Sequence, residues 1–179
     1  MPYVPPPDLA ALSPAEIADL AAQRKLPPVE QWDPQASGDS LMEIKADGRW
    51  FHDGGEIRRP AMIRAFSGLL RRDDDGRHWL VTPHEKQAIE VEDAAFIATD
   101  VASRDGALAF RLNTDEVIVA GPDHPLSVSG DAECPAVYIA VRHGTAARIN
   151  RSTWLQLVEL ASPELTLSSK GMTFSLVPR

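Results

Sequence analysis

The stretch 78-HWLVTPHEKQAIEVED-93 decides the fold expected for this chain. It reads as an apolar strand, a turn and a second strand in which apolar and charged residues alternate. A second stretch, 137-VYIAVRHGTAARINRS-152, has the same outline. When His84 is aligned with His143, Trp79 aligns with Tyr138 and Ala88 with Ala147. We therefore expect two copies of a hairpin-rich unit, although any strand-rich chain shows some echoes of this kind.

The flanking sequence extends this pattern to an α+β fold with duplicated strand-rich units, antiparallel sheets and short helices. Asp47-Gly48 and Asp105-Gly106 are hairpin turn signals. Helices are expected over 60–70, where Pro60 suits the first turn, and after Ser152, which we expect to be the N-cap. Further strands are expected at 78–82, 87–92, 96–102, 107–112, 116–120, 126–129, 137–142 and 146–149, with two more in 162–167 and 172–177.

Three segments are expected along the chain. Residues 1–37 form an N-terminal arm and a helix, because Pro5, Pro6 and Pro7 disfavour regular structure and Ser13 and Glu16 spell a capping box. Residues 38–106 form the first repeat unit, and residues 107–179 form the second.

Composition excludes several classes of protein. The chain has 179 residues, 44% of them hydrophobic, and a net charge of −8. A nucleic-acid polymer is not an expected partner, because duplex-binding proteins carry a basic excess. No apolar run approaches the roughly 18 residues of a membrane helix, and the N-terminus lacks the features of a signal peptide. We therefore expect a cytosolic protein with no membrane partner.

The chain resembles an uncharacterised bacterial family, domain-of-unknown-function family 1285. The resemblance is carried by Gly38-Asp39, DGRWFHDGGEI (47–57), FSGLLRRDDDGRHWLVTP (66–83), EK (85–86) and IEVEDAAF (89–96), and more weakly by NTDEVIVAGPDHPL (113–126). It implies a duplicated core and a C-terminal unit loosely similar to pleckstrin-homology-like barrels. It also implies a ligand, nucleotide-like in character, between the two units and a role in signalling. It implies no reaction, because none is established for the family.

The basic residues are the favoured candidates for a binding site. A phosphate group is held by two or three cations, and arginine adds bidentate geometry. Lys86, Arg142 and Arg71 would form such a pocket if the fold gathers them, and the alternative is ordinary pairing with Asp73 and its neighbours. We complete the candidate ligand-binding set with His84 and His143, which are positional twins, and with Trp50 as a stacking aromatic.

Other chemistry has weaker support in the sequence. His84, His143 and Glu90, with Cys134 as a further candidate ligand, define an alternative as a metal-dependent hydrolase, but no metal-binding spacing occurs. Glu90 and Glu92 share one strand face and are candidates for acid/base work or for a merely solvated face.

The favoured function is a non-enzymatic, cytosolic signalling module with a small anionic or nucleotide-like ligand between its two units. No catalytic residue, metal site or identified cofactor is part of this expectation. A protein-interaction adaptor or a homodimeric structural protein remains the second alternative.

Overall fold

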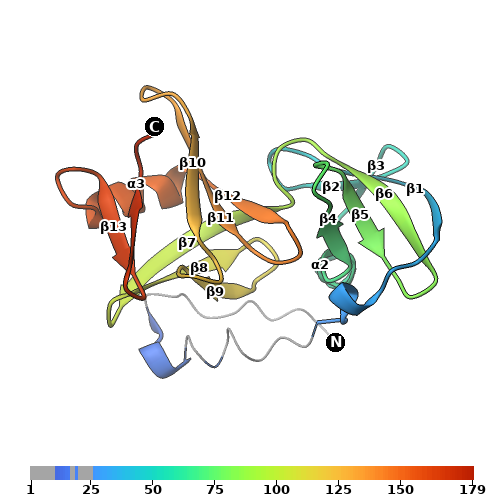
Figure 1. The fold of residues 1–179 in the computed structure, drawn as a ribbon, viewed down its shortest axis with the longest axis horizontal. Coiled ribbons are helices and arrows are strands. Elements are labelled where there is room, and N and C mark those ends of the chain that lie inside the picture. Colours follow the sequence, from blue (N-terminus) through green and yellow to red (C-terminus); the bar gives the residue numbers. More distant parts are fainter. Residues whose placement is uncertain (1–10, 17–18, 20–25) are drawn as a thin grey trace. The chain divides into compact units, whose positions relative to one another are not determined.

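Two compact units make up the chain in a computed structural model, which describes residues 11–16, 19 and 26–179 (Figure 1). The N-terminal unit comprises Lys25–Phe96 together with the short segment Arg142–Ala146. The C-terminal unit contains Ile97–Val141 and Ala147–Arg179. The expected boundary after residue 106 coincides with the turn of a hairpin whose two strands both lie in the C-terminal unit.

The N-terminal unit is built on a six-stranded sheet with the order β3-β2-β1-β6-β5-β4. Its elements, in chain order, are η2 (Val29–Gln31), β1 (Ala36–Ile44), β2 (Trp50–His52), β3 (Gly55–Ile57), α2 (Pro60–Ser67), β4 (Leu70–Arg72), β5 (His78–Val81) and β6 (Glu85–Val91).

The expected hairpin at Asp47-Gly48 joins β1 to β2, and Pro60 opens α2 as predicted. The helix ends three residues earlier than expected, because Leu70 pairs with Leu80 in the sheet.

The pairing of β1 with β6 departs from the expected antiparallel pattern. Strands β1 and β6 run parallel, so this sheet is mixed. The pairing is irregular between Asp39 and Met42, where Leu41 has a φ of 56° and Ser40 donates a hydrogen bond to the Ala88 carbonyl. Sequence patterns do not specify a pairing between strands so far apart in the chain, and a hairpin could not have produced it.

The register separates the two faces of this sheet. Trp50 pairs with Ile44, and Ile44 pairs with Val91, so these three side chains point to one face. Ile89 stands two residues before Val91 in β6 and points to the same face. Trp50 is 1% exposed and stacks on Phe66 of α2 at 6.5 Å between ring centroids, so this face forms the core under the helix. Trp79 pairs with Ala88 and therefore belongs to the opposite face, beside Val29 and Val81.

The C-terminal unit holds a second six-stranded sheet, with the order β10-β11-β12-β7-β8-β9, and a two-stranded sheet. Its elements are β7 (Phe96–Arg104), β8 (Ala107–Leu112), β9 (Val117–Val119), β10 (Leu126–Gly130), β11 (Pro135–Ala140), β12 (Ala146–Ile149), α3 (Arg151–Leu160), β13 (Thr166–Ser169) and β14 (Met172–Ser175). The predicted hairpin at Asp105-Gly106 is present, with positive φ angles of 47° and 74° that suit a two-residue turn.

The duplication is visible in the order of the strands. The order β3-β2-β1-β6-β5-β4 of the first sheet corresponds strand for strand to β9-β8-β7-β12-β11-β10, which is the order of the second sheet read in reverse. His84 and His143 occupy the turns that join the equivalent pairs β5–β6 and β11–β12. The two histidines that align in the sequence therefore also occupy equivalent positions in the two sheets.

Two predicted helix starts have different outcomes. Ser13 and Glu16 form the expected capping box, with backbone N–H donors 2.7 and 3.2 Å from the side-chain oxygens, while most of residues 1–12 and much of the following helix lie outside the described residues. The prediction of Ser152 as N-cap is wrong, because Asn150 caps α3 by accepting from the Thr153 N–H. In the described ranges, no helix is long and apolar enough to span a membrane.

Candidate ligand site on the N-terminal unit

Three cations gather around Trp79 on the sheet face that does not carry α2. Lys86 Nζ lies 4.2 Å from the centre of the Trp79 ring, and the Arg77 guanidinium lies 4.9 Å from it. Arg71 pairs directly with Trp79 across β4 and β5. We call Arg71, Asp73, Arg77, Trp79 and Lys86 the Trp79 cluster.

Strand geometry explains why these side chains meet. Directly paired residues point to the same face, and so do residues two apart in a strand. Arg77 stands two residues before Trp79, and Asp73 two residues after Arg71. Lys86 stands two residues before Ala88, the partner of Trp79. The turn that joins β4 and β5, closed by a hydrogen bond from Asp73 N–H to the Arg77 carbonyl, adds the last two members of the cluster.

One carboxylate serves two of the cations. Asp73 Oδ1 accepts from Arg71 Nε at 2.8 Å, and its Oδ2 lies 3.7 Å from Lys86 Nζ. The side chains are 31% exposed for Asp73, 19% for Arg71 and 24% for Lys86. Their charges are thus partly desolvated, and an anion binding here would compete with Asp73 for both cations.

Trp79 supplies a second unusual group. It is 7% exposed, and its Nε1–H is buried with no hydrogen-bond partner among the described residues. An unpaired buried donor of this kind costs about 1–3 kcal/mol. The buried ring, with two cations against it, offers no open surface on which a nucleobase would stack.

The segment Arg142–Ala146 borders this cluster at β4. The Arg72 N–H donates to the His143 carbonyl at 2.9 Å, so the segment covers part of the edge of β4. Arg142 donates from Nη2 to the Ser67 carbonyl at 3.2 Å and lies 5.1 Å from the centre of the Phe96 ring. Burial lowers the pKa of Arg142 to about 10, which leaves it a cation at neutral pH.

His143 connects this segment to the Trp79 cluster. Its Nε2 lies 3.7 Å from a Glu30 carboxylate oxygen. Burial lowers the pKa of His143, Glu30 opposes this change, and the charges of Arg142 and Arg71 add to the lowering. Of the six predicted residues, Lys86 and Arg71 thus lie in the Trp79 cluster, and His143 lies near Arg71. Arg142 is in the same segment as His143, but it contacts Ser67 at the end of α2 and Phe96.

The other two predicted residues lie elsewhere. Trp50 belongs to the opposite sheet face and is buried against Phe66, so as placed it serves the core. His84 is exposed in its turn, where its N–H is 3.4 Å from Thr82 Oγ1. The expected position of a ligand between the two units stays a prediction.

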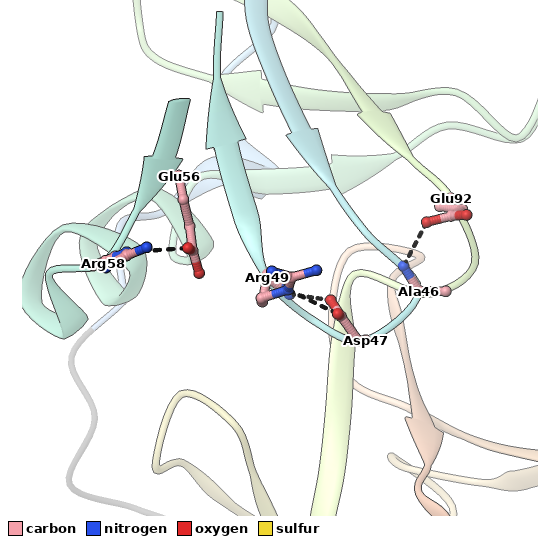
Figure 2. A network of polar contacts seen from close by, with 6 residues as sticks. All are labelled: Ala46, Asp47, Arg49, Glu56, Arg58 and Glu92. Carbon is pink, nitrogen blue, oxygen red and sulfur yellow. Dashed lines mark hydrogen bonds and ion pairs between the residues drawn. The ribbon is translucent and has the colours of Figure 1, made fainter. Parts of the chain in front are cut away.

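The two candidate carboxylates, Glu90 of β6 and Glu92 just after it, are exposed. Glu92 accepts from the Ala46 N–H at 2.8 Å, which ties the end of β6 to the β1–β2 turn. Figure 2 shows this contact beside the Arg49–Asp47 pair. Across the residues that the structure describes, no group of three or more histidine, cysteine or acidic side chains is arranged to hold a metal ion. The hydrolase alternative therefore gains no geometric support.

Sequence reasoning missed three members of the cluster as site residues. Asp73 enters the sequence analysis only as an ordinary pairing partner, and Arg77 does not enter it. Trp79 is a possible stacking aromatic by residue type, but its place in a strand favours a core residue. A usable signal was present, since Arg71-x-Asp73 and Arg77-x-Trp79 place alternate residues on one strand face.

Comparison with known proteins gives a family and a fold. The family model described as the N-terminal domain of a domain of unknown function, DUF1285, matches residues 27–94, and the model of the DUF1285 C-terminal domain matches residues 95–176. The chain is similar to the crystal structure of a DUF1285 family protein from Silicibacter pomeroyi DSS-3, with 37% identity, a TM-score of 0.78, and coverage of 91% of this chain and 93% of the other.

A second solved structure shares the fold. It is a DUF1285 family protein from Shewanella baltica OS155, with 22% identity, a TM-score of 0.56, and coverage of 67% of this chain and 91% of the other. No curated protein matches the chain.

Proposed function

Because the chain belongs to the DUF1285 family, which is described as a domain of unknown function, we propose a function from its own residues. The protein is a cytosolic, non-enzymatic signalling module that binds a small anionic ligand at the Trp79 cluster. The observation that carries this proposal is the gathering of Arg71, Arg77 and Lys86 around one carboxylate and one buried indole.

The local charge supports an anion as the ligand. The protein as a whole has a net charge of −8, whereas this cluster holds three cations and one carboxylate. A positive site in an acidic protein selects small anions, because a large polyanion meets repulsion from the surrounding surface. An acceptor oxygen that reached Trp79 Nε1–H would also satisfy a donor that now has no described partner.

The same geometry narrows the ligand class. A phosphate group matches the cations, since arginine and lysine both bind its oxygens. For a nucleotide, the cluster would therefore recognise the phosphate end, because the Trp79 ring is covered by Lys86 and Arg77. Signalling follows if the bound anion displaces Asp73 from Arg71 and so changes the relative stability of two conformations of the turn that carries it.

The test is a thermal-shift screen with inorganic phosphate, AMP, ATP and GTP. A ligand at about 100 times its Kd stabilises the folded protein by about 2.7 kcal/mol, which is readily seen. We expect at least one of these anions to raise the melting temperature. Lys86→Ala and Arg71→Ala should each weaken its binding about tenfold or more, since a charge-assisted hydrogen bond contributes about 1.5–3 kcal/mol.

Two further variants make the screen specific. Asp73→Asn removes the competing carboxylate and should tighten anion binding about fivefold, the equivalent of about 1 kcal/mol. Arg58→Ala is the matched control, because Arg58 is 83% exposed and pairs with Glu56 outside the cluster. The proposal fails if none of the four anions shifts the melting temperature, or if Lys86→Ala binds as tightly as Arg58→Ala.

A second function, as an adaptor or a self-associating protein, is favoured by Leu41. This side chain is 58% exposed and sits on a backbone with a φ of 56°, which leucine rarely adopts. A costly conformation that displays an apolar side chain favours a role for this side chain in binding another protein. Light scattering over a range of protein concentrations should then show a dimer that Leu41→Asn weakens, and a monomer at every concentration would exclude self-association.

A further inference from the structure

The C-terminal unit contains a small hollow that is separate from the Trp79 cluster. It has a volume of about 150 Å³ and lies among β9, the turn Gly121–His124 and Lys170 of the β13–β14 turn. This is well above the roughly 10–15 Å³ that one water molecule needs. A molecule the size of a small amino acid fits in this space.

The walls of the hollow are held in place by hydrogen bonds. Gly121 and His124 exchange backbone hydrogen bonds of 3.2 Å, which closes the first turn. The Lys170 N–H donates to the Gly106 carbonyl at 3.1 Å. Next to it, buried Ser169 donates from Oγ to the Ala120 carbonyl at 2.7 Å. The two turns are thereby fixed before any ligand arrives, which reduces the entropic cost of binding.

Gly121 and Lys170 are packed tightly against each other. A Cβ atom at Gly121 would lie 3.2 Å from Lys170 Cδ and 3.3 Å from its Cβ. The aliphatic part of Lys170 therefore lies over the glycine backbone, which limits the positions open to the ammonium group at its end. The absence of a side chain at Gly121 is part of what shapes this wall.

The polar groups that line the hollow carry opposite charges. The charged residues are Lys170 and Asp123. Both are exposed at the hollow, and within the described part of the chain neither side chain has an ion-pair partner. His124 Nδ1 lies 2.9 Å from the Ala140 carbonyl. Because a carbonyl only accepts, Nδ1 carries the proton in this hydrogen bond, and in that tautomer Nε2 is an acceptor.

The remaining lining is apolar. Val117, Val119 and Pro122 contribute hydrocarbon surface to the hollow. A ligand that satisfies the whole lining thus needs an anionic group for Lys170, a cationic donor for Asp123 and His124, and a small apolar part. We propose that this hollow binds a small zwitterion, namely a free α-amino acid with a small aliphatic side chain.

The chemistry distinguishes this ligand from simpler ions. A carboxylate alone would leave Asp123 without a counter-charge, and an amine alone would leave Lys170 without one. Both charges on one small molecule pair with both groups, as complementary charges across an interface do. This inference stands apart from the proposed anion site, which lies in the other unit and uses none of the same residues.

Isothermal titration calorimetry with the full chain tests the proposal. The probes are L-alanine and L-valine, with propionate and ethylamine as analogues that carry one charge each. We expect an amino acid to bind, and each analogue to bind at least tenfold more weakly. Lys170→Met and Asp123→Asn should each weaken amino-acid binding at least tenfold while the circular dichroism spectrum stays unchanged.

A matched variant and the contrary results complete the test. Lys45→Met removes an ammonium group that pairs with Glu43 in the other unit, so amino-acid binding should be unchanged. Equal binding of propionate and L-alanine would overturn the zwitterion and leave an anion site only. Absence of binding by both amino acids, or equal affinities in Lys170→Met and Lys45→Met, would overturn the site itself.

Discussion

Single residues in this fold bear strain that a substitution can release, and Leu41 is the clearest case. Its φ of 56° falls in the left-handed region, while 58% of its side chain is exposed and gains little from burial. Asparagine tolerates this region better than leucine. We expect Leu41→Asn to raise the free energy of unfolding by about 0.5–1 kcal/mol, measured by urea denaturation. Met62→Asn is the control at an exposed helical position, and it should lower the free energy of unfolding slightly. A lower free energy of unfolding in Leu41→Asn would show that the backbone at Leu41 is not strained.

At the scale of elements, the contact between the segment Arg142–Ala146 and β4 contributes to the stability of the N-terminal unit. Gly144 has a φ of 79°, and a Cβ atom there would collide with the Arg72 carbonyl oxygen. We expect Gly144→Ala to lower the free energy of unfolding by about 2–3 kcal/mol and to speed hydrogen exchange at the Arg72 amide. Gly171→Ala is the matched control, since its φ is 77° but nothing lies within 4 Å of the added carbon, so it should cost only about 1 kcal/mol. If Gly144→Ala and Gly171→Ala lower the free energy of unfolding equally, the contact with β4 contributes nothing to stability.

At the scale of the whole molecule, two histidines set how stability depends on pH. Burial lowers the pKa of His78 and of His143, so the folded protein binds protons less readily than the unfolded chain, whose histidines titrate near about 6.5. Their contribution is therefore present above about pH 6.5 and is lost as the pH falls through the folded values. We expect the free energy of unfolding to decrease between about pH 7.5 and 5.5, and the decrease to be smaller in His143→Gln. If the free energy of unfolding decreases equally in the unmodified protein and in His143→Gln, His143 does not contribute to the pH dependence.

How far the sequence predicts this molecule also depends on scale. Local signals were reliable: Asp105-Gly106 and the Ser13–Glu16 capping box are where they were expected, because each involves residues only a few positions apart. The parallel pairing of β1 with β6 was not predictable, since no local pattern records a partner more than 40 residues away. The N-cap of α3 was misassigned because Asn150 and Ser152 are both good caps, and only the geometry shows which one accepts from Thr153.

The candidate site follows the same rule. Lys86 and Arg71 were identified from their charge and their place in the family-like sequence, and the register brings them to one face. Trp50 was grouped with them by residue type, yet the register places it on the other face of the sheet. A shift of one residue along a strand reverses the face of a side chain, so residue type alone cannot assemble a site on a sheet.

The discontinuous N-terminal unit has a consequence for biosynthesis. Residues up to Phe96 leave the ribosome well before Arg142–Ala146, so the Arg72 N–H has no His143 carbonyl to donate to during that interval. The nascent unit then exposes part of the β4 edge, the kind of surface on which strands of other chains pair. Synthesis of about 50 further residues separates the two events, which at roughly 5–20 residues per second lasts several seconds. A gene fragment that ends at residue 96 would make this transient state permanent.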